Sequence, residues 1–167
     1  MLILVRHPAA DVAPGLCYGR LDVGLRDPAD AARLAATIRR HRPVAVWSSP
    51  SVRCRQVAQV IGVPVRLDDR LLELGFGDWE GVAWEDVPRP ALDAWAADPL
   101  GFAAPNGESG AALLARVTDL AAELRALAEP VAVISHGGPL RLLGALLRDE
   151  PPDLLAATPP LGSVTIV

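Results

Sequence analysis

The chain has 167 residues, of which 51% are hydrophobic, and its formal net charge is −4 at pH 7. A chain of this length buries a substantial core without disulfides or metal ions, and its apolar content argues against disorder. We therefore expect one folded domain over residues 1–167. The negative net charge gives no general attraction to polyanions, so a nucleic-acid partner is not expected.

All 16 basic residues are Arg, because the sequence contains no Lys. This excludes nucleotide-binding and Schiff-base sites that depend on a Lys amine. Cys17 and Cys54 lie far apart and outside any CxxC pattern, which predicts neither a disulfide scaffold nor a zinc site. Four apolar residues before Arg6 are too few for a signal peptide, and no apolar run is long enough to cross a membrane. The sequence therefore predicts a cytoplasmic protein without a membrane partner.

Short apolar runs alternate with helical patterns along the chain. The runs predict strands at 2–5, 44–47, 131–134 and, from its β-branched residues, 163–167. Apolar spacing near 3.6 residues predicts helices at 28–40, 51–61, 109–127 and 139–147. Alternating strands and helices indicate an α/β fold, which we expect to be a three-layer α/β/α sandwich around a mostly parallel central sheet.

The segment 68–106 differs from the rest of the chain in being rich in Trp, Pro and Asp. It carries one short helical pattern at 91–97. We interpret it as a lid-like excursion from the single domain, with its Trp residues packing in a core or lid.

Polar residues follow the carboxyl ends of three predicted strands: Arg6 and His7 after the first, two Ser and a Pro ahead of Arg53 after the second, and His136 with Gly137 after the third. Ligands bind at this edge of open α/β sheets. Two imidazoles and two guanidiniums, with glycine amides at a helix start, predict an anion site. A phosphate ester fits this set better than a carboxylate does, because several guanidiniums can each bind separate phosphate oxygens.

The histidines and a nearby acid suggest the chemistry. Neighbouring guanidiniums disfavour a charged imidazole, so His7 is expected to be neutral and able to attack phosphorus. Departure of an alkoxide requires a proton from a carboxylic acid. Glu73 is the leading candidate, in competition with Asp78 and Glu80 of the same segment.

Five ordered motifs resemble the histidine phosphatase superfamily, which has the phosphoglycerate-mutase-like fold. They are Leu4-Val5-Arg6-His7, the stretch from Ser48 to Gln56, Leu72-Glu73 with Phe76-Gly77 and Trp79-Glu80-Gly81, Gly107-Glu108-Ser109, and Ser135-His136-Gly137-Gly138. The resemblance implies that His7 becomes phosphorylated, that Arg6, Arg53 and His136 clamp the phosphoryl group, and that Glu73 is the general acid and base. It implies no metal or other cofactor. Pro8 departs from the family pattern, which usually has Gly there, and removes one backbone donor.

Within the family, the short chain and the segment 17–22 are most similar to α-ribazole phosphatases, which act on α-ribazole 5′-phosphate in cobalamin assembly. Tyr18 and Arg20 of this segment are then expected at the rim, in contact with the leaving group, with a solvated loop as the alternative. The alternatives in function are a broad-specificity phosphatase for sugar phosphates or nucleotides, a phosphoglycerate-type mutase, and a phosphate-binding domain without turnover. The expected partner is a small phosphate ester, and the expected assembly is a monomer or homodimer.

Overall fold

The computed structural model describes residues 1–167, which fold around a five-stranded sheet. The strand order is β3-β2-β4-β1-β5, and β5 alone runs antiparallel to its neighbour. The strands are β1 (Leu2–Arg6), β2 (Ala45–Ser48), β3 (Val65–Leu67), β4 (Val131–Ser135) and β5 (Val164–Ile166).

The α-helices are α1 (Ala29–Arg39), α2 (Val52–Gln59), α3 (Arg89–Ala97), α4 (Gly110–Arg125) and α5 (Gly137–Leu147). Three short 3₁₀ turns, η1 (Asp69–Leu71), η2 (Gly77–Trp79) and η3 (Trp84–Asp86), interrupt the excursion. No helix combines the length and the apolar character needed to cross a membrane.

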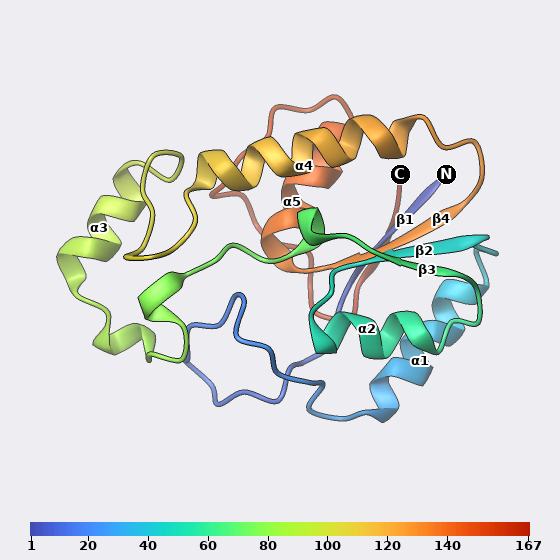
Figure 1. Cartoon of the computed structure of the whole chain (residues 1–167), viewed down its shortest axis with the longest axis horizontal. Helices are drawn as coiled ribbons and strands as arrows, with labels where there is room; N and C mark the ends of the chain where they lie inside the picture. Colours follow the sequence, from blue (N-terminus) through green and yellow to red (C-terminus); the bar gives the residue numbers. More distant parts are fainter.

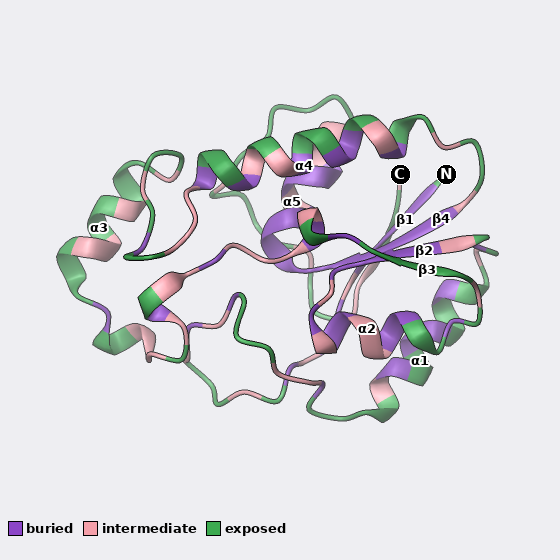
Figure 2. Ribbon diagram, in the orientation of Figure 1, coloured by how far each residue is buried: buried purple, intermediate pink, exposed green.

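Alternate residues of each central strand enter two separate cores, one on each face of the sheet. In β1, Leu2 and Leu4 pack with α4 and α5, whereas Ile3 and Val5 pack with α1 and α2. Figure 2 shows the central strands as the most buried layer, with helices on both sides. Successive side chains of a strand point to opposite faces, and both faces here are covered. The predicted three-layer α/β/α sandwich is confirmed.

The strand register brings the polar residues after three strands to one edge of the sheet. Arg6 of β1 lies opposite Ser135 of β4, and Ser48 of β2 lies opposite Ile134. The pairing of β1 with β4 continues beyond Arg6, because the His7 amide donates to the Ser135 carbonyl over 3.2 Å. The residues that follow β1, β2 and β4 are therefore neighbours in space.

The edge strand β3 is absent from the elements expected from the sequence. Its three residues are too few to establish the alternation of a strand, and all three are exposed. It forms because Val46, Trp47 and Ser48 of β2 offer it a partner strand. The expected strands and helices are otherwise present, with ends that differ by at most two residues.

The excursion 68–106 lies beyond the carboxyl ends of the strands, with α3 at the far end of the molecule (Figure 1). Edge-to-face and stacked aromatic pairs hold it together, with ring centroids 5.4 to 6.3 Å apart. These rings belong to Phe76, Trp79, Trp84, Trp95 and Phe102. The excursion also contacts the loop after β1, since Cys17 and Val82 form a backbone hydrogen bond of 2.8 Å.

The packing of α4 on the sheet predicts a large cost for a cavity there. Leu120 is fully buried in the core beneath α4 and α5. We expect Leu120→Ala to lower the free energy of unfolding by about 2–5 kcal/mol, measured by urea denaturation. Leu161→Ala, at a position 46% exposed, should change it by less than about 0.5 kcal/mol. Equal losses in the two variants would contradict this description of the core.

Candidate active site

His7 follows β1 and is almost completely buried. Its Nδ1 lies 2.6 Å from the carbonyl oxygen of Pro8, and its Nε2 lies 3.3 Å from Nε of Arg53. A guanidinium only donates, so Nε2 must be the acceptor, and the proton resides on Nδ1 and is donated to Pro8. The ring is thereby fixed as a neutral tautomer whose Nε2 carries an electron pair, which accepts the Arg53 donor.

The surroundings of His7 oppose its protonation. Burial, assisted by the positive charges of Arg53 and Arg6, lowers the pKa of His7 to about 3, against a smaller raising effect of the hydrogen bond to Pro8. The imidazole is therefore neutral throughout the physiological pH range.

Arg53 lies in the first turn of α2 and is fully buried. Besides its bond to His7, it donates to the carbonyl oxygens of Leu21 over 3.0 Å and Gly19 over 2.6 Å. Its guanidinium carbon lies 5.3 Å from the centre of the Tyr18 ring. The loop after β1 therefore wraps around this charge, which is how Tyr18 comes close to the site.

His136 is the residue that precedes α5, and its ring lies edge-on to that of His7 with centroids 5.0 Å apart. Its Nε2 lies 2.8 Å from the Ser49 hydroxyl and 3.6 Å from the Cys54 sulfur. Burial and the charge of Arg53 lower the pKa of His136 well below its usual value. Burial raises the pKa of Cys54 to about 12, so this thiol stays protonated.

The buried nitrogens without a protein partner include Nδ1 of His136 and Nε of Arg6. The Arg6 guanidinium is bound at its other end, where Nη1 donates to the Thr158 hydroxyl over 3.2 Å and to the Pro159 carbonyl over 2.6 Å. A Cβ at Gly137 would lie 3.1 Å from the guanidinium carbon of Arg6. A glycine at the start of α5 thus lets the arginine approach the helix closely.

The three acids that compete in the sequence have different surroundings. Glu73 accepts from the Gly138 amide over 3.1 Å at the start of α5, and from Leu74 over 2.9 Å. The Asp78 carboxylate is bound to the Asn106 side chain at 3.0 and 3.1 Å. Of Glu73 and Asp78, only Glu73 contacts the start of α5, the helix that His136 directly precedes.

Glu80 braces the loop after β1. Its carboxylate accepts four backbone amides, from Gly19, Arg20, Leu21 and Phe76, at 2.9 to 3.0 Å. Burial raises the pKa of Glu80, but these four hydrogen bonds outweigh that effect and leave it below the usual value. Glu80 is therefore ionised and saturated with donors, whereas Glu73 is the carboxylate that lies at the start of α5.

The whole chain matches one family. A family model described as the histidine phosphatase superfamily (branch 1) covers residues 2–167. The chain belongs to the histidine phosphatase superfamily. Family membership and phosphatase-named relatives make it a phosphatase.

Two curated relatives and one solved structure illustrate the likeness. Glucosyl-3-phosphoglycerate phosphatase of Mycobacterium tuberculosis is 30% identical over 98% of this chain and 80% of its own length. Adenosylcobalamin/α-ribazole phosphatase of Salmonella typhimurium is 32% identical over 90% and 80%. The α-ribazole phosphatase structure from Shigella flexneri superimposes with a TM-score of 0.88 and 26% identity, covering 98% of this chain and 87% of that one. The predicted fold family is confirmed.

A pocket of about 300 Å³ lies beside Glu73 and Gly138 in this phosphatase. Its wall combines residues of the excursion, of α4 and α5, and of the segment between α5 and β5, and most of it is apolar. The apolar part of the wall consists of Leu74, Phe76, Trp95, Pro99, Leu113, Leu154 and Leu155. Arg141 is the one cationic residue of the lining. The pocket has the size and position to receive an organic group attached to phosphate.

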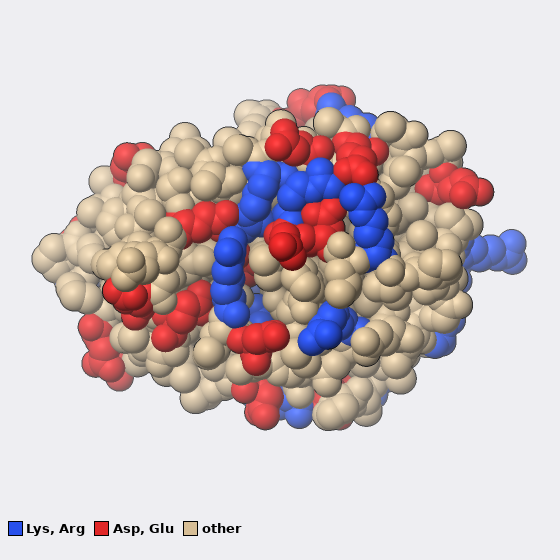
Figure 3. Space-filling model, viewed as in Figure 1, with Lys and Arg blue, Asp and Glu red and all other residues tan.

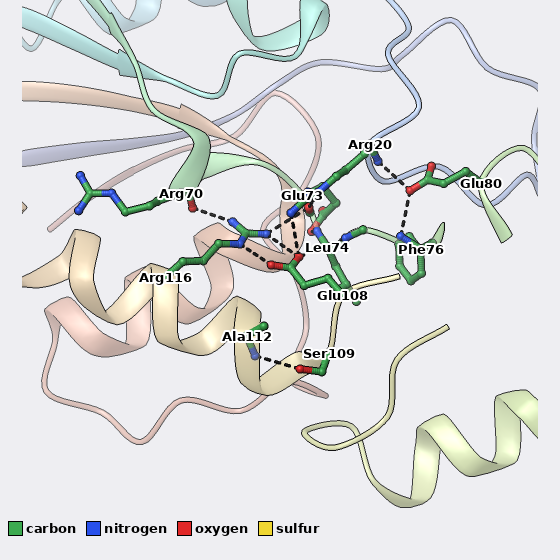
Figure 4. A network of polar contacts seen from close by, with 11 residues as sticks. Arg20, Arg70, Glu73, Leu74, Phe76, Glu80, Glu108, Ser109, Ala112 and Arg116 are labelled. Carbon is green, nitrogen blue, oxygen red and sulfur yellow. Dashed lines mark hydrogen bonds and ion pairs between the residues drawn. The ribbon is translucent and has the colours of Figure 1, made fainter. Parts of the chain in front are cut away.

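Several surface arginines are paired with acids, unlike Arg6 and Arg53 of the site. Figure 3 shows an interrupted band of arginines with acidic side chains among them. Arg70, for example, lies 2.6 Å from both Asp68 and Glu123. Arg20, expected at the rim, binds Glu108 over 3.2 Å and the Glu73 carbonyl over 3.3 Å (Figure 4).

The sequence did not reveal several of these contacts. Thr158 and Pro159 carry no motif that would link them to Arg6, more than 150 residues away. Glu108 lies in the Gly-Glu-Ser motif but was given no role, and Arg116 was not singled out at all. The two residues are eight positions apart and Glu108 precedes α4, so the helical pairing of residues three or four apart does not link them.

The lowered pKa values predict a loss of stability in mild acid. Between pH 6.5 and 3, an unfolded His7 binds a proton that the folded protein does not, and His136 behaves alike. The unfolded state therefore gains stability as the pH falls through this window, by up to about 1.4 kcal/mol per pH unit for each histidine. We expect urea denaturation at pH 7, 6 and 5 to show this fall, and His7→Asn to reduce its slope. His41→Asn is the control. If stability falls with pH as steeply in His7→Asn as in the wild type, the lowered pKa of His7 does not cause the fall.

Proposed function

We propose that this phosphatase is a metal-independent phosphomonoesterase that works through a phosphohistidine at Nε2 of His7. The observation that supports it best is the fixed tautomer of His7, because the Arg53 and Pro8 contacts leave the electron pair on Nε2. A neutral imidazole is a nucleophile, whereas a binding domain without turnover has no need of one.

In the first step, His7 Nε2 attacks phosphorus and the bond to the ester oxygen breaks, with its electron pair remaining on that oxygen. Glu73 in its acid form supplies the proton, so that a neutral alcohol leaves. The imidazole becomes positively charged when its Nε2 is phosphorylated, and the Nδ1–H bond to Pro8 stabilises that charge.

In the second step, the Glu73 carboxylate takes a proton from water, and the oxygen of that water attacks phosphorus as the P–N bond breaks. Inorganic phosphate and neutral His7 are the products, and Glu73 is again an acid. Charge spread over the equatorial oxygens in both steps is stabilised by Arg6, Arg53 and His136. The unpartnered Nε of Arg6 and Nδ1 of His136 are consistent with that role, since buried polar atoms normally have partners.

The covalent step is tested by removing the nucleophile. We expect His7→Asn to lower kcat/KM by roughly 10⁴-fold or more while the protein stays folded. His41→Asn, which changes a histidine outside the site, should retain wild-type activity. Wild-type enzyme quenched in base during turnover of a ³²P-labelled substrate should carry acid-labile label that is absent from His7→Asn. Substantial turnover by a folded His7→Asn variant would refute the mechanism.

For the natural substrate we propose α-ribazole 5′-phosphate, with the segment 68–106 acting as a lid over its ring. The segment 17–22 is similar to that of α-ribazole phosphatases, and two proteins of that name are among the relatives. Phe76 and Trp95 from the excursion line the pocket beside Glu73, where an aromatic leaving group would be buried. The M. tuberculosis relative makes glucosyl-3-phosphoglycerate the competing candidate.

A substrate panel tests this choice. Burying an aromatic ring in the pocket contributes about 1.5–3 kcal/mol, so kcat/KM for α-ribazole 5′-phosphate should exceed that for simple sugar phosphates by roughly 10- to 100-fold. The panel includes glucosyl-3-phosphoglycerate, nucleotides, phosphoserine and phosphoglycerates, all with EDTA present. A flat profile, or a preference for another member, would overturn the substrate assignment but leave the phosphohistidine chemistry intact. Transfer between phosphoglycerates would instead indicate a mutase.

A further inference from the structure

Glu73 lies on a stretch of chain without regular secondary structure. The residues 72–76 connect η1 with η2, and no helix or strand ladder holds them. A general acid works only when its carboxyl is held within about half an ångström of the productive position. Its backbone must therefore be fixed by other contacts.

Two guanidiniums bind the carbonyl oxygen of Glu73. Arg20 from the loop after β1 donates over 3.3 Å, and Arg116 from α4 donates over 3.2 Å. Arg116 also donates to the carbonyl of Arg70 over 2.7 Å. Figure 4 shows Arg116 projecting from α4 toward this stretch of backbone. The Arg116 side chain thus holds the backbone at both Arg70 and Glu73.

Glu108 completes the attachment on the other side. It receives Arg116 through two parallel bonds of 2.7 and 2.9 Å, and its carboxylate also accepts from the Gly75 amide and from Arg20, both over 3.2 Å. The side chains of Glu108 and Arg116 are only 14% and 15% exposed, so the pair is largely shielded from solvent. Burial raises the pKa of Glu108, but its bonds to Arg116 outweigh this and keep it ionised.

We propose that Arg116 and Glu108 are positioning residues that aim the Glu73 carboxyl at the leaving-group oxygen. This inference rests on the proposed role of Glu73 as general acid. Neither residue touches the histidines or the phosphoryl site. They fix the backbone at residues 70, 73 and 75, and the carboxylate itself then has only the amides of Leu74 and Gly138 to orient it.

The contribution of Arg116 and Glu108 to kcat/KM should be largest for substrates whose leaving group needs a proton from Glu73. An alkyl phosphate leaves as a strongly basic alkoxide and requires the proton of Glu73, whereas 4-nitrophenolate leaves without it. The ratio of kcat/KM for the two substrates therefore reports how well Glu73 is placed. Loss of general stability or of phosphate binding would lower both values alike.

The test compares Arg116→Met with Arg125→Met on the same helix. Arg125 is half exposed and pairs with Asp149, far along α4 from the site. We expect Arg116→Met to lower kcat/KM for an alkyl phosphate by about 10- to 100-fold and that for 4-nitrophenyl phosphate by less than about threefold. Arg125→Met should leave both unchanged. Glu108→Gln, which keeps the shape of the side chain, should give the same pattern as Arg116→Met and serves as the main variant should Arg116→Met fold poorly.

Combination with Glu73→Gln separates positioning from support of the fold. In the Glu73→Gln background, Arg116→Met and Glu108→Gln should cause no further loss with the alkyl phosphate, because the acid is already gone. Arg116→Lys, which keeps the charge without the two-pronged contact, should recover only part of the activity. Equal loss with both substrates, or additive loss with Glu73→Gln, would overturn the proposal.

The same data distinguish this inference from the proposed function. If Glu73→Gln itself shows no dependence on the leaving group, the assignment of Glu73 as the acid fails. If Glu73→Gln shows the dependence and neither Glu108→Gln nor Arg116→Met does, only the positioning inference fails.

Discussion

The buried guanidinium of Arg53 is the constraint around which the site is organised. A charge removed from water costs several kcal/mol unless it is well hydrogen-bonded, and none of the Arg53 bonds goes to a carboxylate. Two loop carbonyls, His7 and the face of Tyr18 supply the compensation. The loop after β1 must therefore hold its shape, and the four amides gathered by Glu80 provide that rigidity.

Burial sets the protonation state of the two histidines, and the same positive charge reinforces it. Both imidazoles are therefore neutral, and the proposed nucleophile His7 needs no proton removed before it reacts. A phosphate dianion would offset the charge of Arg6 and Arg53. The buried positive charges that are costly by themselves would therefore favour binding of the substrate and of its transition state.

The choice among three acids shows where sequence reasoning reaches its limit. Glu73, Asp78 and Glu80 lie within eight residues on one irregular segment, and their spacing gives no reason to prefer any of them. Their backbone surroundings separate them, because the Gly138 amide meets Glu73 while four amides saturate Glu80. The edge strand β3 escaped detection for a related reason, since three residues are too few to establish a strand pattern and depend on β2 for their conformation.

The sequence by itself determined the alternation of strands and helices, and with it the gathering of His7, Arg53 and His136 at one edge of a parallel sheet. The tertiary structure alone decided the tautomer of His7, the attachment of Glu73 by Arg116 and Glu108, and the apolar wall of the pocket. These features depend on contacts between residues far apart in the chain, which local periodicity does not encode.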